Sequence, residues 1–244
     1  MTQKLILLVT LLVVGCARPT KAVDPILPVV EKGRQVYVKM CATCHGPGGN
    51  GYAADNAPSL RSPTFLASAT DTFLNAGITR GRPGTAMGAF GRELGGPLSP
   101  EDVNAVIAFL HEGAPPRASL EPAPVPGDAK RGKPLYDSIC ARCHGTPTQR
   151  SSAVHLANPV LLQTASDAFL RFAIVNGRPP TSMVPWKGAL PAAQLEDVIA
   201  YVRSMAVAPG VPPTPPQLGM PPAPRTGPAV ARCAPAQLSD TMPN

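Results

Sequence analysis

The chain has 244 residues, of which 5% are aromatic and 32 are proline. A chain of this composition would struggle to build two complete hydrophobic cores from its own side chains. The formal net charge is +7, but the basic residues are scattered rather than clustered, which argues against a nucleic-acid-binding protein.

The N-terminal segment has the composition of an export signal. A short basic start precedes mostly aliphatic residues, 5–14, a run too short to span a bilayer as a helix, which needs about 20 residues. Small residues then precede Cys16, an order that resembles the processing site of bacterial lipoproteins. We therefore expect residues 1–15 to be a signal peptide, Cys16 to carry lipid on the periplasmic face of a membrane, and residues 16–29 to be a tether. The alternatives are an ordinary secretory signal with a chance cysteine, or an uncleaved anchor.

A pentapeptide of the form Cys-x-x-Cys-His occurs twice in the chain. The two copies are Cys41-Ala-Thr-Cys44-His45 and Cys140-Ala-Arg-Cys143-His144. Two cysteines at this spacing on a helical turn can reach the two vinyl groups of one porphyrin, and the adjacent histidine can ligate its iron. A zinc site or a redox-active cysteine pair is the alternative, but neither accounts for a histidine directly after both copies. The motifs therefore predict two covalently bound haem c groups.

Around the first motif the sequence predicts a helical domain. A helix is expected to begin near Val30 and to lead into the motif. The last helix of the domain begins with Ser99-Pro100-Glu101-Asp102, because serine can cap a helix, proline suits its first position and acidic residues suit its first turn. These limits predict a first domain over residues 30–114, followed by an extended, semi-stiff, proline-rich linker over residues 115–126.

Residues 127–208 repeat the first domain. The matched features are a glycine and a tyrosine before each motif, a Gly-Arg-Pro segment, a methionine soon after it, and an aromatic residue in the last helix. In the two domains these are Gly33 and Gly132, Tyr37 and Tyr136, 81–83 and 177–179, Met87 and Met183, and Phe109 and Tyr201. Each glycine is expected to let its helix cross closely over the last helix, whereas Pro134 predicts a late start or a kink. The proline-rich residues 209–244 are expected to be a disordered tail.

This order of features resembles that of class I c-type cytochromes, and the duplication resembles the tandem dihaem members of that family. The resemblance implies an all-α fold in which each of two domains wraps around one haem. It implies thioether bonds from both cysteines of each motif, proximal ligation by His45 and His144, and ligation of the opposite haem faces by Met87 and Met183. It also implies that the carbonyl groups of Pro58 and Pro159 accept a hydrogen bond from the histidine rings. Turn prolines and gap-filling methionines are the alternatives.

Other residues gain an expected role from the repeat. Phe90 and Trp186 lie at equivalent places after the methionines and are expected to shield the haem edges. Arg82 and Arg178 either pair with haem propionates or lie in solvent. His111 has no counterpart in the second domain, so it is expected to be a surface or packing residue.

A haem iron held by histidine and methionine has no vacant position for a substrate, so the sequence predicts electron transfer rather than catalysis. We expect a membrane-tethered carrier that passes electrons between respiratory or photosynthetic redox proteins. It is expected either to diffuse on its tether or to be a fixed subunit of a larger oxidoreductase. The alternative is a haem enzyme such as a peroxidase, which would need one haem to lose its methionine.

The charge differs between the two domains. Residues 24–114 contain seven Lys and Arg against eight Asp and Glu, whereas residues 127–208 contain nine against five. This asymmetry predicts that an acidic redox partner meets the second domain.

Overall fold

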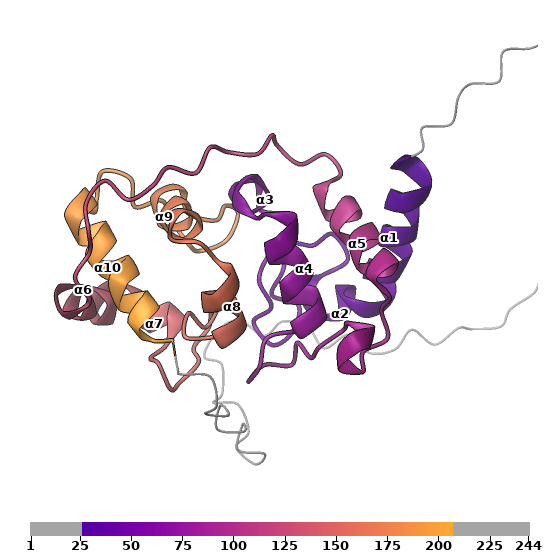
Figure 1. Ribbon diagram of the computed structural model, residues 1–244, viewed down its shortest axis with the longest axis horizontal. Helices are drawn as coiled ribbons and strands as arrows, with labels where there is room; N and C mark the ends of the chain where they lie inside the picture. Colours follow the sequence, from indigo (N-terminus) through magenta and orange to yellow (C-terminus); the bar gives the residue numbers. More distant parts are fainter. Residues whose placement is uncertain (1–25, 207–244) are drawn as a thin grey trace, which may run out of the picture. The chain divides into compact units, whose positions relative to one another are not determined.

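The computed structural model describes residues 26–206, in which all regular elements are helices apart from one isolated bridge between Gly91 and Leu98. This confirms the predicted all-α class (Figure 1). The predicted signal peptide, Cys16 and the predicted tail over 209–244 lie outside the described residues. No helix between residues 26 and 206 combines the length and the apolar character needed to cross a membrane.

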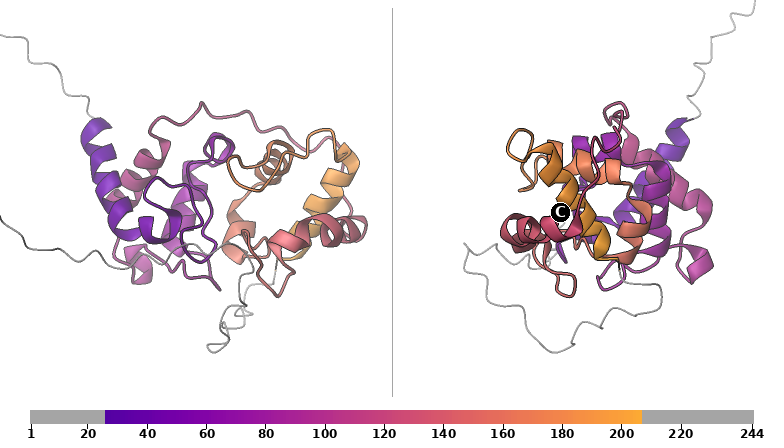
Figure 2. Two further views of the ribbon diagram at one scale, coloured as in Figure 1. Left: turned by 180° about the vertical axis from the view of Figure 1, so that it is seen from behind. Right: turned by 60° about the vertical axis from the view of Figure 1, so that its left-hand side comes forward.

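Each half of the described chain contains a similar succession of helices. The first half contains α1 (Ile26–Met40), α2 (Ala42–His45), α3 (Pro63–Ser68), α4 (Asp71–Arg80), the 3-10 turn η1 (Arg92–Leu94) and α5 (Pro100–His111). The second contains α6 (Ala129–Leu135), the π-helical turn η2 (Tyr136–Cys140), α7 (Ala141–His144), α8 (Pro159–Thr164), α9 (Asp167–Asn176) and α10 (Ala192–Ser204). Figures 1 and 2 show α5 packed against α1 and α10 packed against α6. The predicted duplication is therefore visible in the order and the packing of the helices.

A glycine permits the crossing between the first and last helices of each half. A Cβ atom on Gly33 would lie 1.9 Å from the carbonyl oxygen of Ala105 in α5. A Cβ atom on Gly132 would likewise lie 1.9 Å from the carbonyl oxygen of Asp197 in α10. Real Cβ atoms do not approach other atoms so closely, so both crossings require glycine, as the sequence predicts.

An aromatic pair fills each of these crossings. The ring centroids of Tyr37 and Phe109 are 5.2 Å apart, and those of Tyr136 and Tyr201 are also 5.2 Å apart. Each tyrosine hydroxyl donates a hydrogen bond to the carbonyl of the glycine after the motif histidine, at 2.7 Å in the first half and 2.9 Å in the second. The crossing helices therefore fix the loop that follows each Cys-x-x-Cys-His motif.

The first helix of each half differs from its predicted form. Helix α1 begins at Ile26, so residues 26–29, which were expected to belong to the tether, are helical. Pro28 lies in the first turn, where a missing N–H breaks no helical bond. In the second half, α6 starts without delay after Asp128, and the chain changes to the π-helical turn η2 shortly after Pro134. Proline supplies no N–H to the helical ladder, so the expected irregularity takes the form of this wider turn.

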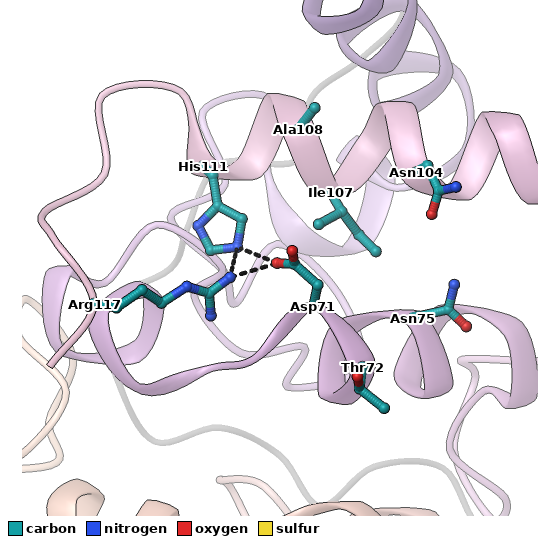
Figure 3. Close-up of a pocket in the computed structure, with 8 residues that line it drawn as sticks. All are labelled: Asp71, Thr72, Asn75, Asn104, Ile107, Ala108, His111 and Arg117. Atoms are coloured by element: carbon teal, nitrogen blue, oxygen red, sulfur yellow. Dashed lines mark hydrogen bonds and ion pairs between the residues drawn. The ribbon is translucent and has the colours of Figure 1, made fainter. Parts of the chain in front are cut away.

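The linker is extended, as predicted, but it does not stand free of the helical domains. The guanidinium of Arg117 contacts the carboxylate of Asp71 at the start of α4 and the ring of His111 at the end of α5 (Figure 3). The His111 ring and the Asp71 carboxylate also lie 3.2 Å apart. Further along the linker, the carbonyl of Glu121 accepts a hydrogen bond of 2.8 Å from Arg171 in α9. The linker is thus bound to both halves of the chain.

The two halves also contact each other through equivalent helices. Helix α3 of the first half packs on α9 of the second, and α4 of the first half packs on α8 of the second. Because α3 corresponds to α8 and α4 to α9, these two contacts are equivalent. Phe73 and Phe169 hold equivalent positions in α4 and α9, and their ring centroids are 4.8 Å apart. The hydroxyl of Thr64 donates to the carbonyl of Gly177 at 2.7 Å, and the amide of Asn158 donates to the carbonyl of Pro83 at 3.0 Å.

Candidate haem sites

The first site is built where α1 passes into the short helix α2. Cys41 lies between the two helices, and Cys44 and His45 lie in α2, with both cysteines half-buried as free thiols. His45 is only 6% exposed, and its Nδ1 lies 2.9 Å from the carbonyl oxygen of Pro58. This is the contact that the resemblance predicts, and it leaves Nε2 as the ring nitrogen available to a metal. Burial lowers the pKa of His45, which favours the neutral ring that binds metal.

The second site repeats this arrangement with a different hydrogen-bond acceptor. Nδ1 of His144 lies 2.8 Å from the carbonyl oxygen of Val154, so the expected contact with Pro159 is wrong. Pro159 is the first residue of α8, and a carbonyl at that position is directed along the helix axis toward the next turn. Its true counterpart is Pro63, which starts α3 in the same way. The sequence signal for this match is a polar residue at the N-cap position directly before each proline, Ser62 and Asn158, of which Asn158 caps its helix through its side chain.

The methionine loops of the two halves have the same backbone hydrogen bonds. The arginine N–H of each Gly-Arg-Pro segment donates to the methionine carbonyl at 2.8 Å, in the pairs Arg82–Met87 and Arg178–Met183. The methionine N–H in turn donates to a threonine hydroxyl, at 3.0 Å in the first loop and 3.2 Å in the second. Both loops therefore present their methionine in an equivalent way.

All the predicted ligands line one cavity. It is bordered by Cys41, Cys44, His45 and Met87 from the first half, and by Cys140, Cys143, His144 and Met183 from the second half. Phe90 and Trp186 also line it, and the backbone N–H of each donates to a carbonyl of the preceding long helix, at 3.1 Å and 3.0 Å. Most of the lining is apolar, so two thiol pairs, two imidazoles and two thioethers face a space suited to porphyrin rings. Within residues 26–206, no group of three or more His, Cys, Asp and Glu side chains could hold a metal ion, as a zinc site would require.

This duplicated all-α fold, with its paired motifs and methionine loops, defines a class I c-type cytochrome that carries two covalently bound haem c groups. More closely, the chain belongs to the family described as cytochrome c oxidase, cbb3-type, subunit III, which matches residues 28–110 and 127–202.

Curated relatives carry the name of the same oxidase subunit. The chain is 30% identical over 192 residues to the cbb3-type cytochrome c oxidase subunit CcoP of Azospirillum sp. (strain B510), which covers 71% of this chain and 61% of the relative. It is 28% identical over 186 residues to the cbb3-type cytochrome c oxidase subunit FixP of Bradyrhizobium sp. (strain ORS 278), which covers 71% of this chain and 60% of the relative. The chain thus spans about three fifths of the length of these relatives.

Proposed function

We propose that the chain is a membrane-tethered electron carrier that works on the extracytoplasmic side as the cytochrome subunit of a larger respiratory oxidoreductase. The observation that carries this proposal is the equivalent pair of histidine and methionine sets on one cavity. The names of the relatives favour a fixed subunit over a freely diffusing carrier. The tether is proposed to be lipid on Cys16, which rests on the sequence alone.

The protein contributes ligands, orientation and exclusion of water. Haem c bound in this cavity supplies a one-electron change of oxidation state. His45 and His144 are held by backbone carbonyls, which fix the ring orientation and raise the basicity of the ligating nitrogen. Met87 and Met183 are proposed to close the opposite faces, where a thioether favours the reduced state. With a histidine and a methionine both bound to each iron, the site would leave no place for a substrate.

Carbon monoxide binding tests the closed sites. The reduced, haem-loaded chain is expected to show no change in its absorbance spectrum under carbon monoxide, because neither iron has a free position. Met87→Ala and Met183→Ala should each open one site and show binding by one haem. If one haem of the unaltered chain binds the gas readily, the haem-enzyme alternative is favoured and the carrier proposal fails.

Purification from native membranes tests the assembly. After extraction with a mild detergent, the chain is expected to elute together with other polypeptides and with cytochrome c oxidase activity. If lipid supplies the tether, labelled palmitate should be incorporated into the unaltered chain but not into Cys16→Ser. A lone chain that elutes as a stable monomer would favour the freely diffusing carrier instead.

A further inference from the structure

Four side chains form a continuous stack where the two halves of the chain meet. The guanidinium of Arg82 lies 5.4 Å from the ring centroid of Phe73. The ring of Phe73 lies 4.8 Å from that of Phe169, and the guanidinium of Arg178 lies 5.0 Å from the ring of Phe169. The order is therefore Arg82, Phe73, Phe169, Arg178, with an arginine at each end.

The stack belongs to the wall of the haem cavity. All four of its side chains line the cavity that also contains both sets of predicted haem ligands. Phe65 of α3 closes one side, with its ring edge-on to Phe73 and Phe169 at 6.2 and 6.4 Å. Because Phe73 and Phe169 are equivalent residues, as are Arg82 and Arg178, the stack presents one cation to each haem site.

Neither arginine has an anionic partner in the part of the chain that the structure describes. Within residues 26–206, the guanidinium of Arg82 makes one hydrogen bond, of 3.4 Å, to the carbonyl of the neighbouring Gly81. Nη1 of Arg178 donates to the carbonyl of Thr64 at 3.0 Å, but its Nη2 is buried and has no hydrogen-bond partner. Asp55, an acidic residue on the cavity wall, is paired with Arg150.

Both arginines still carry their charge at neutral pH. Burial lowers the pKa of each guanidinium to about 10, and for Arg82 the charge of Arg80 adds to this effect. A partly buried cation without a counter-ion is unfavourable, and a buried N–H without an acceptor is unfavourable as well. A ligand with carboxylates would satisfy both requirements, and each haem has two propionate groups.

We propose that Arg82 and Arg178 bind haem propionates, one arginine for each haem, at the stack where the two domains meet. The inference rests on the two haem groups and not on the proposed oxidase assembly, so it can fail or succeed independently. A cation beside a haem disfavours the oxidised state, which carries one more positive charge, and so raises the reduction potential. Since Thr64 of the first domain holds Arg178 of the second, contact between the domains helps to position the cation at the second haem.

Redox titration of the full-length, haem-loaded chain tests this pairing. The variants are Arg82→Gln and Arg178→Gln, each with a charge-conserving partner, Arg82→Lys and Arg178→Lys. Arg61→Gln is the matched control, because Arg61 stacks on Phe109 at 4.5 Å but does not line the haem cavity. Absorbance of the two haems is followed against potential, and covalent haem content is checked by haem staining of denatured protein.

Each Gln variant is expected to lower the reduced-to-oxidised ratio of one haem about tenfold at fixed potential, which corresponds to about 59 mV for a one-electron couple. The Lys variants should restore most of this change, and the Arg61→Gln control should stay within about twofold of the unaltered chain. If a Gln variant fails to retain haem while its Lys partner loads and titrates normally, the need for charge supports the proposal. Unchanged potentials in both Gln variants overturn it. Equal shifts or equal loss of haem in the Lys and Gln variants also overturn it, because the arginines would then serve only in packing.

Discussion

Asp102 is a single carboxylate that holds together the start of a helix. Its Oδ2 accepts a hydrogen bond of 3.0 Å from the backbone N–H of Ser99, while its own N–H donates to the Ser99 hydroxyl at 3.2 Å. The ammonium group of Lys32 in α1 lies 2.8 Å from Oδ1. Lys32 first, and the Ser99 contacts next, hold the pKa of Asp102 down at about 2, below its ordinary value of 3.8. The carboxylate therefore stabilises the folded state in its charged form, at the crossing of α1 and α5.

We expect Asp102→Asn to lower the free energy of unfolding by about 1 kcal/mol at pH 7, because the charged cap is lost. A lowered folded-state pKa gives stability that is complete above pH 3.8 and is lost as the pH falls through 2. The difference between the variant and the unaltered chain should therefore shrink between pH 4 and pH 2. This difference in the free energy of unfolding is measured at each pH by urea titration, with haem absorbance as the signal. Glu93→Gln, at an exposed acid, is the control, and a deficit that persists in full at pH 2 would contradict the charge-based explanation.

A residue's role is easier to predict from the sequence when its side chain performs that role than when its backbone does. Cysteine, histidine and methionine act through their side chains, so the sequence could propose ligands for the two haem sites, and all of these residues line one cavity. The acceptor for His144 is a backbone carbonyl, which every residue has, and nothing in the identity of Val154 marks it. The same holds for the acceptor that Arg178 meets, which is the backbone carbonyl of Thr64.

Helix starts could be predicted where a side chain caps the first turn. Helix α5 begins at Pro100, after a capping box formed by Ser99 and Asp102, as the sequence indicates. The sequence predicts a start of α1 near Val30, later than the observed start at Ile26, because the prolines before Val30 favour a tether. Packing of α1 on α5 stabilises the helix, and this long-range contact leaves no local signal. Pro134 predicts an irregular first helix in the second half, but it does not predict that the irregularity is a π-helical turn. A capping side chain therefore marks where a helix begins, whereas local signals do not show how a helix adapts to its neighbours.

The duplication is the large-scale feature that the sequence predicts well, while the contact between the domains is not predictable from it. The repeat follows from matched motifs along the chain. The contact between Phe73 and Phe169 depends on how the surfaces of the two folded domains fit together. From the sequence, both residues are predicted only to lie on the apolar face of a helix. The linker is likewise predicted to be a spacer, although Arg117 binds the carboxylate of Asp71 at the start of α4. Polar contacts made by an extended segment leave no periodic pattern to detect.

The positive charge of the second domain is concentrated on a few free side chains. Its acidic residues are all in ion pairs, namely Asp128, Asp137, Asp167, Glu196 and Asp197. Among the described residues, the exposed cations of this domain with no recorded ion pair are Lys130, Arg142 and Lys187. Arg142 lies between the two cysteines of the second motif, and Lys187 follows Trp186 of the cavity wall. Two of these three cations, Arg142 and Lys187, therefore lie beside the proposed second haem site, where an acidic partner would approach.

Oxidation of the reduced protein by ferricyanide, a small anionic oxidant, tests whether this charge directs electron transfer. We expect the double variant Arg142→Glu, Lys187→Glu to react on the order of tenfold more slowly at low ionic strength, because attraction becomes repulsion. The difference should largely vanish at 1 M salt, where the screening length is about 3 Å. Lys130→Glu should have a much smaller effect, because neither Lys130 nor its chain neighbours in α6 line the haem cavity, whereas Arg142 lines it and Lys187 follows Trp186 of its wall. Equal slowing by Lys130→Glu would show that net charge alone governs the rate, and a rate independent of salt would exclude electrostatic guidance at the second haem.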